Sequence, residues 1–261
     1  MMIISFKKQI LLSVSPLIDF YNISLKPLPI PFWFLPNSYP DIDQDIVLNT
    51  LFKLESEGLV KRSFLGKTKY VHLTKEGLFK LTSGITNNQY LREIWDGKLR
   101  LVFFDIPESD RKLRDEMRFS LIELGFVIWQ RSVFVSPHMV EAEILLRARN
   151  LGIENMVNVV LSDRLVNRNV VDLVWDLYKL KSINERYNIF ISQADHLLTS
   201  KITNYKKWVE RCMSLRYTYY DILTCEPFLP TGITGGEYRG IEASEYFLNL
   251  GKKLITVLER V

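Results

Sequence analysis

Cysteine and histidine are scarce in this sequence, and the motifs of common enzyme sites are missing. The two cysteines, Cys212 and Cys225, are too few for a disulfide framework in 261 residues and fit a reducing cellular interior. The three histidines are scattered and lack the spacing of a metal site. The stretch GITGGEYRG has neither the lysine nor the preceding strand of a phosphate-binding loop. From these absences we expect a protein without a cofactor and without enzymatic activity.

Long apolar runs are also missing. No stretch reaches the roughly 18 apolar residues that a membrane-spanning helix needs. Near the start, Lys7 and Lys8 precede a short apolar run, but Pro16 and Asp19 follow it and no cleavage site of small residues is present. We expect a folded first helix there, no membrane partner and a cytoplasmic protein.

Positive charge is not in large excess, because the formal net charge is only +4. A nucleic acid would therefore have to meet a local basic surface rather than a uniformly cationic molecule. Apolar residues make up 47% of the chain, which is enough to bury a core. The length suggests two or three domains.

The first 81 residues show the pattern of a winged helix-turn-helix. Residues 41–57 carry an apolar helical stripe, and Gly58 follows where a helix would end. Residues 59–73 predict two short strands around Gly66, and a further helix begins at Thr74. Helix, hairpin and helix in this order predict a wing next to a recognition helix.

The predicted wing is basic and is a candidate for binding DNA phosphates. No acidic residue lies between Gly58 and Leu73, and closely spaced cations neutralise phosphates and release counterions. The polar line of the preceding helix adds groups that can bind base edges. The candidate DNA-binding residues are Lys61, Arg62, Lys67 and Lys69 on the hairpin and Asn49 and Lys53 on the helix. A solvated hairpin with no partner is the alternative.

Two features argue against standard binding in the DNA groove. The predicted recognition helix and its flanks carry five carboxylates, which would repel phosphates: Asp41, Asp43, Asp45, Glu55 and Glu57. Residues 26–40 contain five prolines, which predicts an extended segment without a regular helix. The aromatic residues of this segment either plug a core or form a partner surface.

Residues 98–166 predict a ferredoxin-like βαββαβ domain. Apolar strand patterns alternate with helical stripes, and Gly125 stops the first of the two helices. The expected elements are 99–104, 108–124, 126–129, 132–135, 140–151 and 156–161. Residues 82–97 are polar enough for a linker, and residues 167–261 predict a C-terminal helical domain. The predicted fold class is therefore α+β, with three domains.

The stretch WDGKLRLVFFDIPESDRKLRDEMRFSLIELGFVIWQRSVFVSP resembles the central domain of the PaaX family of bacterial phenylacetate-catabolism repressors. Its motifs fall in the family's order: Trp95-Asp96-Gly97, Asp105-Ile106-Pro107, Leu124-Gly125-Phe126 and Ser132 to Pro137. The predicted wing and the segment CEPFLPTGITGGEYRGIEASEYF are also similar to this family. The resemblance implies a repressor that binds a two-fold operator in double-stranded DNA as a homodimer and is relieved by an acyl-coenzyme A thioester.

The PaaX central domain in turn resembles the small CRISPR-associated adaptation nucleases, and Asp105 matches the acid that is thought to hold a divalent metal in them. One carboxylate per chain makes a poor Mg²⁺ site unless a dimer brings two together. Alternatively, Asp105 accepts N–H bonds from the next helix or pairs with Arg111 or Arg114. Two other functions stay open: a Mg²⁺-dependent nuclease or nucleic-acid scaffold, and a homologue that acts through protein contacts alone.

Overall fold

The computed structural model describes residues 6–14, 30–32, 34–37, 39, 41–65, 67–82 and 94–258. The chain divides into two compact units. The first contains Met1–Ile85, Asn184–Glu226 and Arg239–Val261, and the second contains Thr86–Ile183 and Pro227–Tyr238. Each unit is described by itself below.

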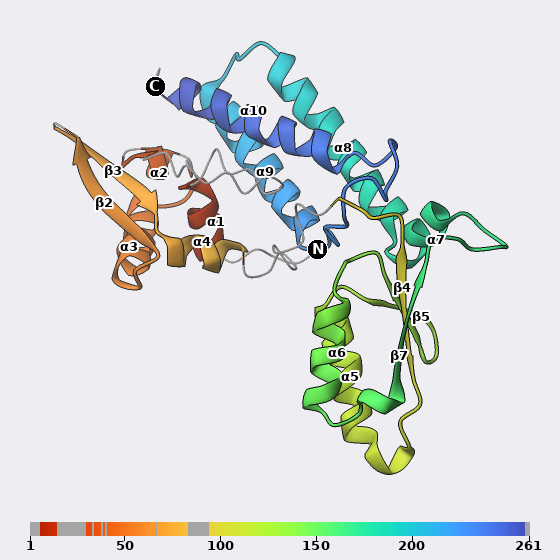
Figure 1. The fold of residues 1–261 in the computed structure, drawn as a ribbon. Helices are drawn as coiled ribbons and strands as arrows, with labels where there is room; N and C mark the ends of the chain where they lie inside the picture. The colour runs from red at the N-terminus through yellow and green to blue at the C-terminus, as the bar shows by residue number, and fades with distance from the viewer. Residues whose placement is uncertain are drawn as a thin grey trace. The chain divides into compact units, whose positions relative to one another are not determined.

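The N-terminal part of the first unit has the element order of a winged helix (Figure 1). Helix α1 (Phe6–Ser13), strand β1 (Ile30–Pro31) and helix α2 (Phe34–Asn37) come first. They are followed by α3 (Gln44–Ser56), β2 (Val60–Leu65), β3 (Thr68–Leu73) and α4 (Lys75–Thr82). The strands form an antiparallel sheet in the order β1-β3-β2, with β2 and β3 as the wing.

Local sequence signals explain where α3 begins and ends. The side chain of Asp43 caps its start by accepting the Asp45 N–H at 2.8 Å. Val47, Leu51 and Leu54 form a fully buried stripe at helical spacing. Gly58, with φ of 74°, follows the helix in the left-handed region that glycine adopts without a side-chain clash.

The proline-rich segment differs from expectation. The prediction that residues 26–40 contain no regular helix is wrong at Phe34–Asn37, where α2 forms a single turn. Pro36 is tolerated because the first turn of a helix leaves its N–H groups without intrahelical partners. Residues 26–29, 33, 38 and 40 of this segment, and residues 83–93 of the predicted linker, lie outside the described residues.

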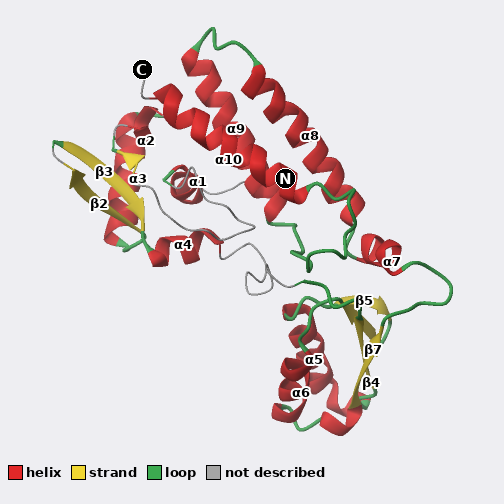
Figure 2. Ribbon diagram, turned by 45° about the horizontal axis from the view of Figure 1, so that its top comes forward, coloured by secondary structure: helices red, strands yellow, loops and turns green. Residues whose placement is uncertain are grey.

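The second unit contains the predicted βαββαβ arrangement (Figure 2). Its antiparallel sheet has the order β5-β6-β4-β7. The strands are β4 (Leu99–Phe104), β5 (Val127–Gln130), β6 (Val133–Ser136) and β7 (Val157–Ser162). The helices are α5 (Arg111–Glu123) and α6 (Glu141–Asn150). A 3-10 turn, η2 (Glu108–Asp110), precedes α5, and another, η3 (Glu154–Met156), follows α6. The predicted ferredoxin-like order is confirmed.

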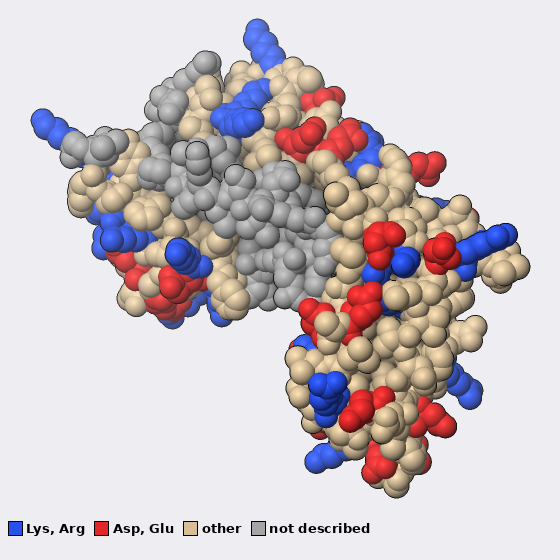
Figure 3. All heavy atoms as spheres, in the orientation of Figure 1, with Lys and Arg blue, Asp and Glu red and all other residues tan. Residues whose placement is uncertain are grey.

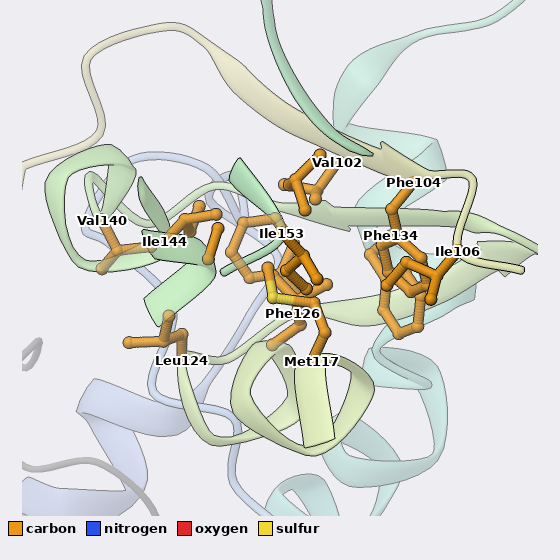
Figure 4. Close-up of a cluster of buried hydrophobic side chains, with 13 residues drawn as sticks. Val102, Phe104, Ile106, Met117, Leu124, Phe126, Phe134, Val140, Ile144 and Ile153 are labelled. Carbon is orange, nitrogen blue, oxygen red and sulfur yellow. The ribbon is translucent and has the colours of Figure 1, made fainter. Parts of the chain in front are cut away.

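The core of this domain lies between the sheet and its two helices (Figure 4). Val102, Phe104 and Phe134 extend from the sheet, and Met117 and Ile144 meet them from the helices. The rings of Phe104 and Phe134 stack at 5.7 Å between centroids. Alternate residues of β4 therefore face these helices, and the residues between them face the other side of the sheet.

Four helices follow: α7 (Val170–Leu177), α8 (Leu180–Thr199), α9 (Tyr205–Leu223) and α10 (Gly240–Leu258). Helices α9 and α10 pack together around buried aromatic rings, with Tyr219 stacked on Phe247 at 4.6 Å. The guanidinium of Arg216 is fully buried and lies 4.0 Å over the Phe247 ring. None of the described helices is long and apolar enough to cross a membrane.

Candidate nucleic-acid interface

Lys61 and Lys67 are the two most available cations of the wing. Both side chains are exposed, on or next to the antiparallel strands β2 and β3. Within the described part of the chain, neither ammonium group has a hydrogen-bond or ion-pair partner. Figure 3 shows basic side chains on the face of the β2–β3 hairpin. Free ammonium groups on a projecting hairpin are suited to binding phosphates.

Arg62 and Lys69, the other two wing candidates, have intramolecular contacts. Arg62 forms an ion pair with Glu55 and lies 4.8 Å over the Phe52 ring, both on α3. The hydrogen bond from Arg62 lowers the pKa of the Glu55 carboxyl. Lys69 lies 4.5 Å over the Phe32 ring. Arg62 thus fastens the wing to α3, and Lys69 covers an aromatic ring.

Asn49 and Lys53 share the exposed face of α3, as the sequence predicts. Ile46 and Phe52 lie on the same face and are 53% and 42% exposed. The face combines amide, ammonium and apolar groups, which together can contact base edges and thymine methyls.

The carboxylates around α3 are mostly engaged, which bears on the predicted repulsion of phosphate. Glu55 pairs with Arg62, Glu57 pairs with Lys7 at 2.5 Å, and Asp41 pairs with Lys206 at 3.1 Å. The hydrogen bond from Lys7 lowers the pKa of the Glu57 carboxyl. Asp43 serves as the cap of α3. Exposed ion pairs add little stability, but here each one cancels a negative charge.

Phe64 is a surface feature of the wing that the sequence reasoning missed. Its ring is 71% exposed near the end of β2, and it pairs in register with Lys69, whose ammonium lies 5.9 Å from the ring centroid. A large aromatic side chain inside a basic run was the available signal. Exposed rings among cations are typical of surfaces that stack on or wedge between bases.

Asp105 lies just after β4 and is exposed. Its backbone N–H donates to the Met156 carbonyl at 3.2 Å, but its carboxylate has no partner among the described residues. The predicted pairing with Arg111 or Arg114 is wrong, because Arg114 binds Glu108 at 2.7 Å and Arg111 lies 3.7 Å from Asp115. The described residues contain no group of three or more metal-binding side chains around it.

The Trp95-Asp96-Gly97 motif has a structural role. Asp96 binds the buried guanidinium of Arg100 through both carboxylate oxygens, at 2.6 and 2.7 Å. Glu141, at the start of α6, accepts a third bond from Arg100 at 2.7 Å. This network ties β4 to α6. Desolvation opposes the charge of Arg100, but its hydrogen bonds to the two carboxylates leave its pKa raised.

Together, the fold and this surface define a winged-helix protein with an appended ferredoxin-like domain. Residues 92–174 match the family model described as the PaaX protein central Cas2-like domain. Residues 92–174 are therefore similar to the central domain of PaaX proteins. This agrees with the resemblance that the Trp95 to Pro137 motifs carry.

One solved structure extends the comparison beyond the central domain. The uncharacterized protein Rv0674 from Mycobacterium tuberculosis is similar with a TM-score of 0.57 at 13% sequence identity. The alignment covers 92% of this chain and 95% of that protein. The likeness is one of fold, and it includes parts of the chain on both sides of the central domain. No curated protein sequence matches the chain significantly.

Proposed function

We propose that this protein is a DNA-binding transcriptional regulator, a repressor of the PaaX type, and not an enzyme. The observation that carries the proposal is the pair of cations, Lys61 and Lys67, on the wing of a winged helix, which have no partner among the described residues. Beside them, the exposed face of α3 offers Asn49 and Lys53 for base contacts. In this account Arg62 and Lys69 hold the wing in place and add positive charge.

The proposed regulator acts as a homodimer on a two-fold operator. Exposed apolar side chains on the sheet face opposite α5 and α6 support this. Phe103 and Val160 are 40% and 43% exposed, and Leu101 pairs with Val160 across β4 and β7. Burial of such a face against a second copy is favourable by about 25 cal/mol per Å² of apolar surface.

Each predicted domain has its own role in this proposal. Residues 1–81 would bind DNA, residues 98–166 would form the dimer, and residues 167–261 would respond to an effector of the acyl-coenzyme A kind, with 82–97 as the linker. Chromosomal DNA is the partner, so the proposed place of action is the cytoplasm.

One observation favours a second candidate, a Mg²⁺-dependent nuclease. The carboxylate of Asp105 is exposed and has no partner among the described residues, so it can share a metal with the same residue of a second copy. This candidate needs a second copy to complete its metal site, whereas every DNA-contact group proposed for the regulator lies within one chain.

Two assays on one preparation separate the candidates. Fluorescence anisotropy with DNA fragments from upstream of the gene measures duplex binding, and labelled DNA and RNA incubated with Mg²⁺ measure cleavage. The regulator predicts salt-sensitive duplex binding that Lys61→Glu with Lys67→Glu abolishes, and no cleavage. Cleavage that is lost in Asp105→Asn would overturn it in favour of the nuclease. Absence of both binding and cleavage would leave protein contacts as the function.

A further inference from the structure

A groove between α8 and α9 is lined by hydrogen-bond donors and positive charge. Its volume is about 500 Å³, which lies within the range of small-molecule sites. Ser192, Gln193 and His196 line it from α8, and Arg211 and Ser214 line it from α9. No carboxylate is among the described residues that form the lining. The whole groove belongs to the first unit.

Two parts of the lining select for different parts of a ligand. Arg211 is exposed, and in the described part of the chain its guanidinium has no hydrogen-bond or ion-pair partner. Leu197, which is only 5% exposed, and Leu215 add an apolar surface beside it. An anionic head would take charge-assisted hydrogen bonds from Arg211, and an apolar group would cover the two leucines. A cation would meet Arg211 and find no acid to bind.

Two tyrosines of α9 outside the groove contact the winged helix. The Tyr217 hydroxyl donates to the Tyr39 hydroxyl at 2.8 Å, and Tyr39 is in turn hydrogen-bonded to Ser13 of α1 at 2.7 Å. The Tyr220 hydroxyl donates to the Leu81 carbonyl at the end of α4. An α-helix turns by about 100° per residue, so Tyr220 lies about 180° and Tyr217 about 120° from Arg211 around the helix axis.

We infer that the α8–α9 groove binds a small organic anion that carries an apolar group, and that α9 transmits this binding to the winged helix. A ligand held by Arg211 contacts α9 directly, while Tyr217 connects α9 through Tyr39 to α1 and Tyr220 connects it to α4. The regulatory meaning of the transmission rests on the proposed function. The site itself does not.

A pair of probes with opposite charge tests the site. Octanoate and octylammonium have the same chain and differ in the head group, and amide chemical shifts in two-dimensional NMR measure binding and its location. Octanoate should shift Ser192, His196 and Ser214 saturably, and octylammonium should not. Arg211→Gln and Arg211→Glu should weaken octanoate binding by about tenfold or more, because a charge-assisted bond is lost.

The control is Arg149→Glu, which makes the same charge change at an exposed residue of α6 in the other unit. Its octanoate affinity should equal that of the unmodified protein. Equal binding of both probes, no saturable binding of octanoate, or unchanged affinity in both Arg211 variants would overturn the site.

The same spectra test the transmission. Octanoate should also shift the amide signals of Tyr39 and of α1, and Tyr217→Phe, which removes the hydroxyl bond to Tyr39, should diminish those distant shifts without weakening octanoate binding. Shifts confined to the groove would overturn the transmission. Because none of these measurements uses DNA, a failure of DNA binding is recorded separately from a failure of this site.

Discussion

Loss of the Asp96 carboxylate should destabilise the central domain far more than loss of an ordinary surface acid. The side chain of Arg100 is 2% exposed, and its guanidinium donates two hydrogen bonds to the Asp96 carboxylate. Removing one partner of a buried ion pair costs about 3–5 kcal/mol because a charge is left uncompensated. Glu141 remains beside Arg100 in Asp96→Ala, so we expect a loss of about 2–3 kcal/mol.

Urea denaturation followed by circular dichroism gives this difference, and Glu108→Ala is its matched control. Glu108 binds Arg114 at 2.7 Å, but its side chain is 71% exposed, so its loss should cost less than about 1 kcal/mol. The double variant Asp96→Ala with Arg100→Met should recover part of the loss, since no buried charge is left unpaired.

The pH dependence of the free energy of unfolding is a second test of the interaction between Asp96 and Arg100. The hydrogen bond from Arg100 lowers the pKa of Asp96 below its ordinary value of 3.8. A lowered folded-state pKa means that the stabilisation is complete above the unfolded value and is lost as pH falls through the folded value. The stability gap between the native protein and Asp96→Ala should therefore be constant at neutral pH and shrink below about pH 4. A gap no larger than that of Glu108→Ala would refute this account of the motif.

Two further predictions concern Gly125 and Phe64. Gly125→Ala should lower the free energy of unfolding in urea by about 2–4 kcal/mol, because φ is 82° and a Cβ would lie 2.8 Å from the buried His138 ring. The control Gly152→Ala, with φ of 68° and open space around the Cβ, should lower it by about 1 kcal/mol. Equal losses in the two variants would contradict the clash with His138. Phe64→Ala should weaken duplex binding by about tenfold in fluorescence anisotropy without changing its salt dependence, because stacking carries no charge. Phe79→Ala, at a ring that is 74% exposed on α4, should leave binding unchanged, and an equal loss would contradict a specific role for Phe64.

The regular elements could be predicted because their signals are local. The stripe Val47, Leu51 and Leu54, the cap at Asp43 and the stop at Gly58 all act within a few residues of one another. The same is true of the alternation in β4 that places Val102 and Phe104 in the core. The short helix α2 was missed because five prolines in residues 26–40 outweigh any helical pattern when they are counted by composition alone.

The charge balance of the candidate interface could not be predicted, because its partners are distant in sequence. The five acids around α3 look repulsive in the sequence, yet Lys7 and Lys206 come from other elements to pair with two of them. Likewise, Arg62 appears in sequence as a phosphate ligand, but folding places it against Glu55. Only the tertiary structure distinguishes the free cations of the wing from those that are paired.

For Asp105, at the end of β4, nearness in sequence predicted ion pairs that the structure does not form. Proximity in sequence suggested Arg111 and Arg114 as partners, but both side chains meet acids on their own helical segment. The exposed position after β4 permits a free carboxylate because water solvates it at no cost. A carboxylate at this exposed position is therefore stable without an ion pair.

The salt dependence of duplex binding measures how many wing cations contact phosphates. Each phosphate contact by a lysine contributes about 0.9 to the slope of log K against log salt concentration. Lys61→Gln with Lys67→Gln should therefore reduce the magnitude of this slope by about two, uniformly across DNA sequences. The control, Lys112→Gln with Lys181→Gln, changes two exposed lysines outside the wing and should leave the slope unaltered. An unchanged slope in the wing variant, or an equal change in the control, would contradict the wing as the DNA-binding surface.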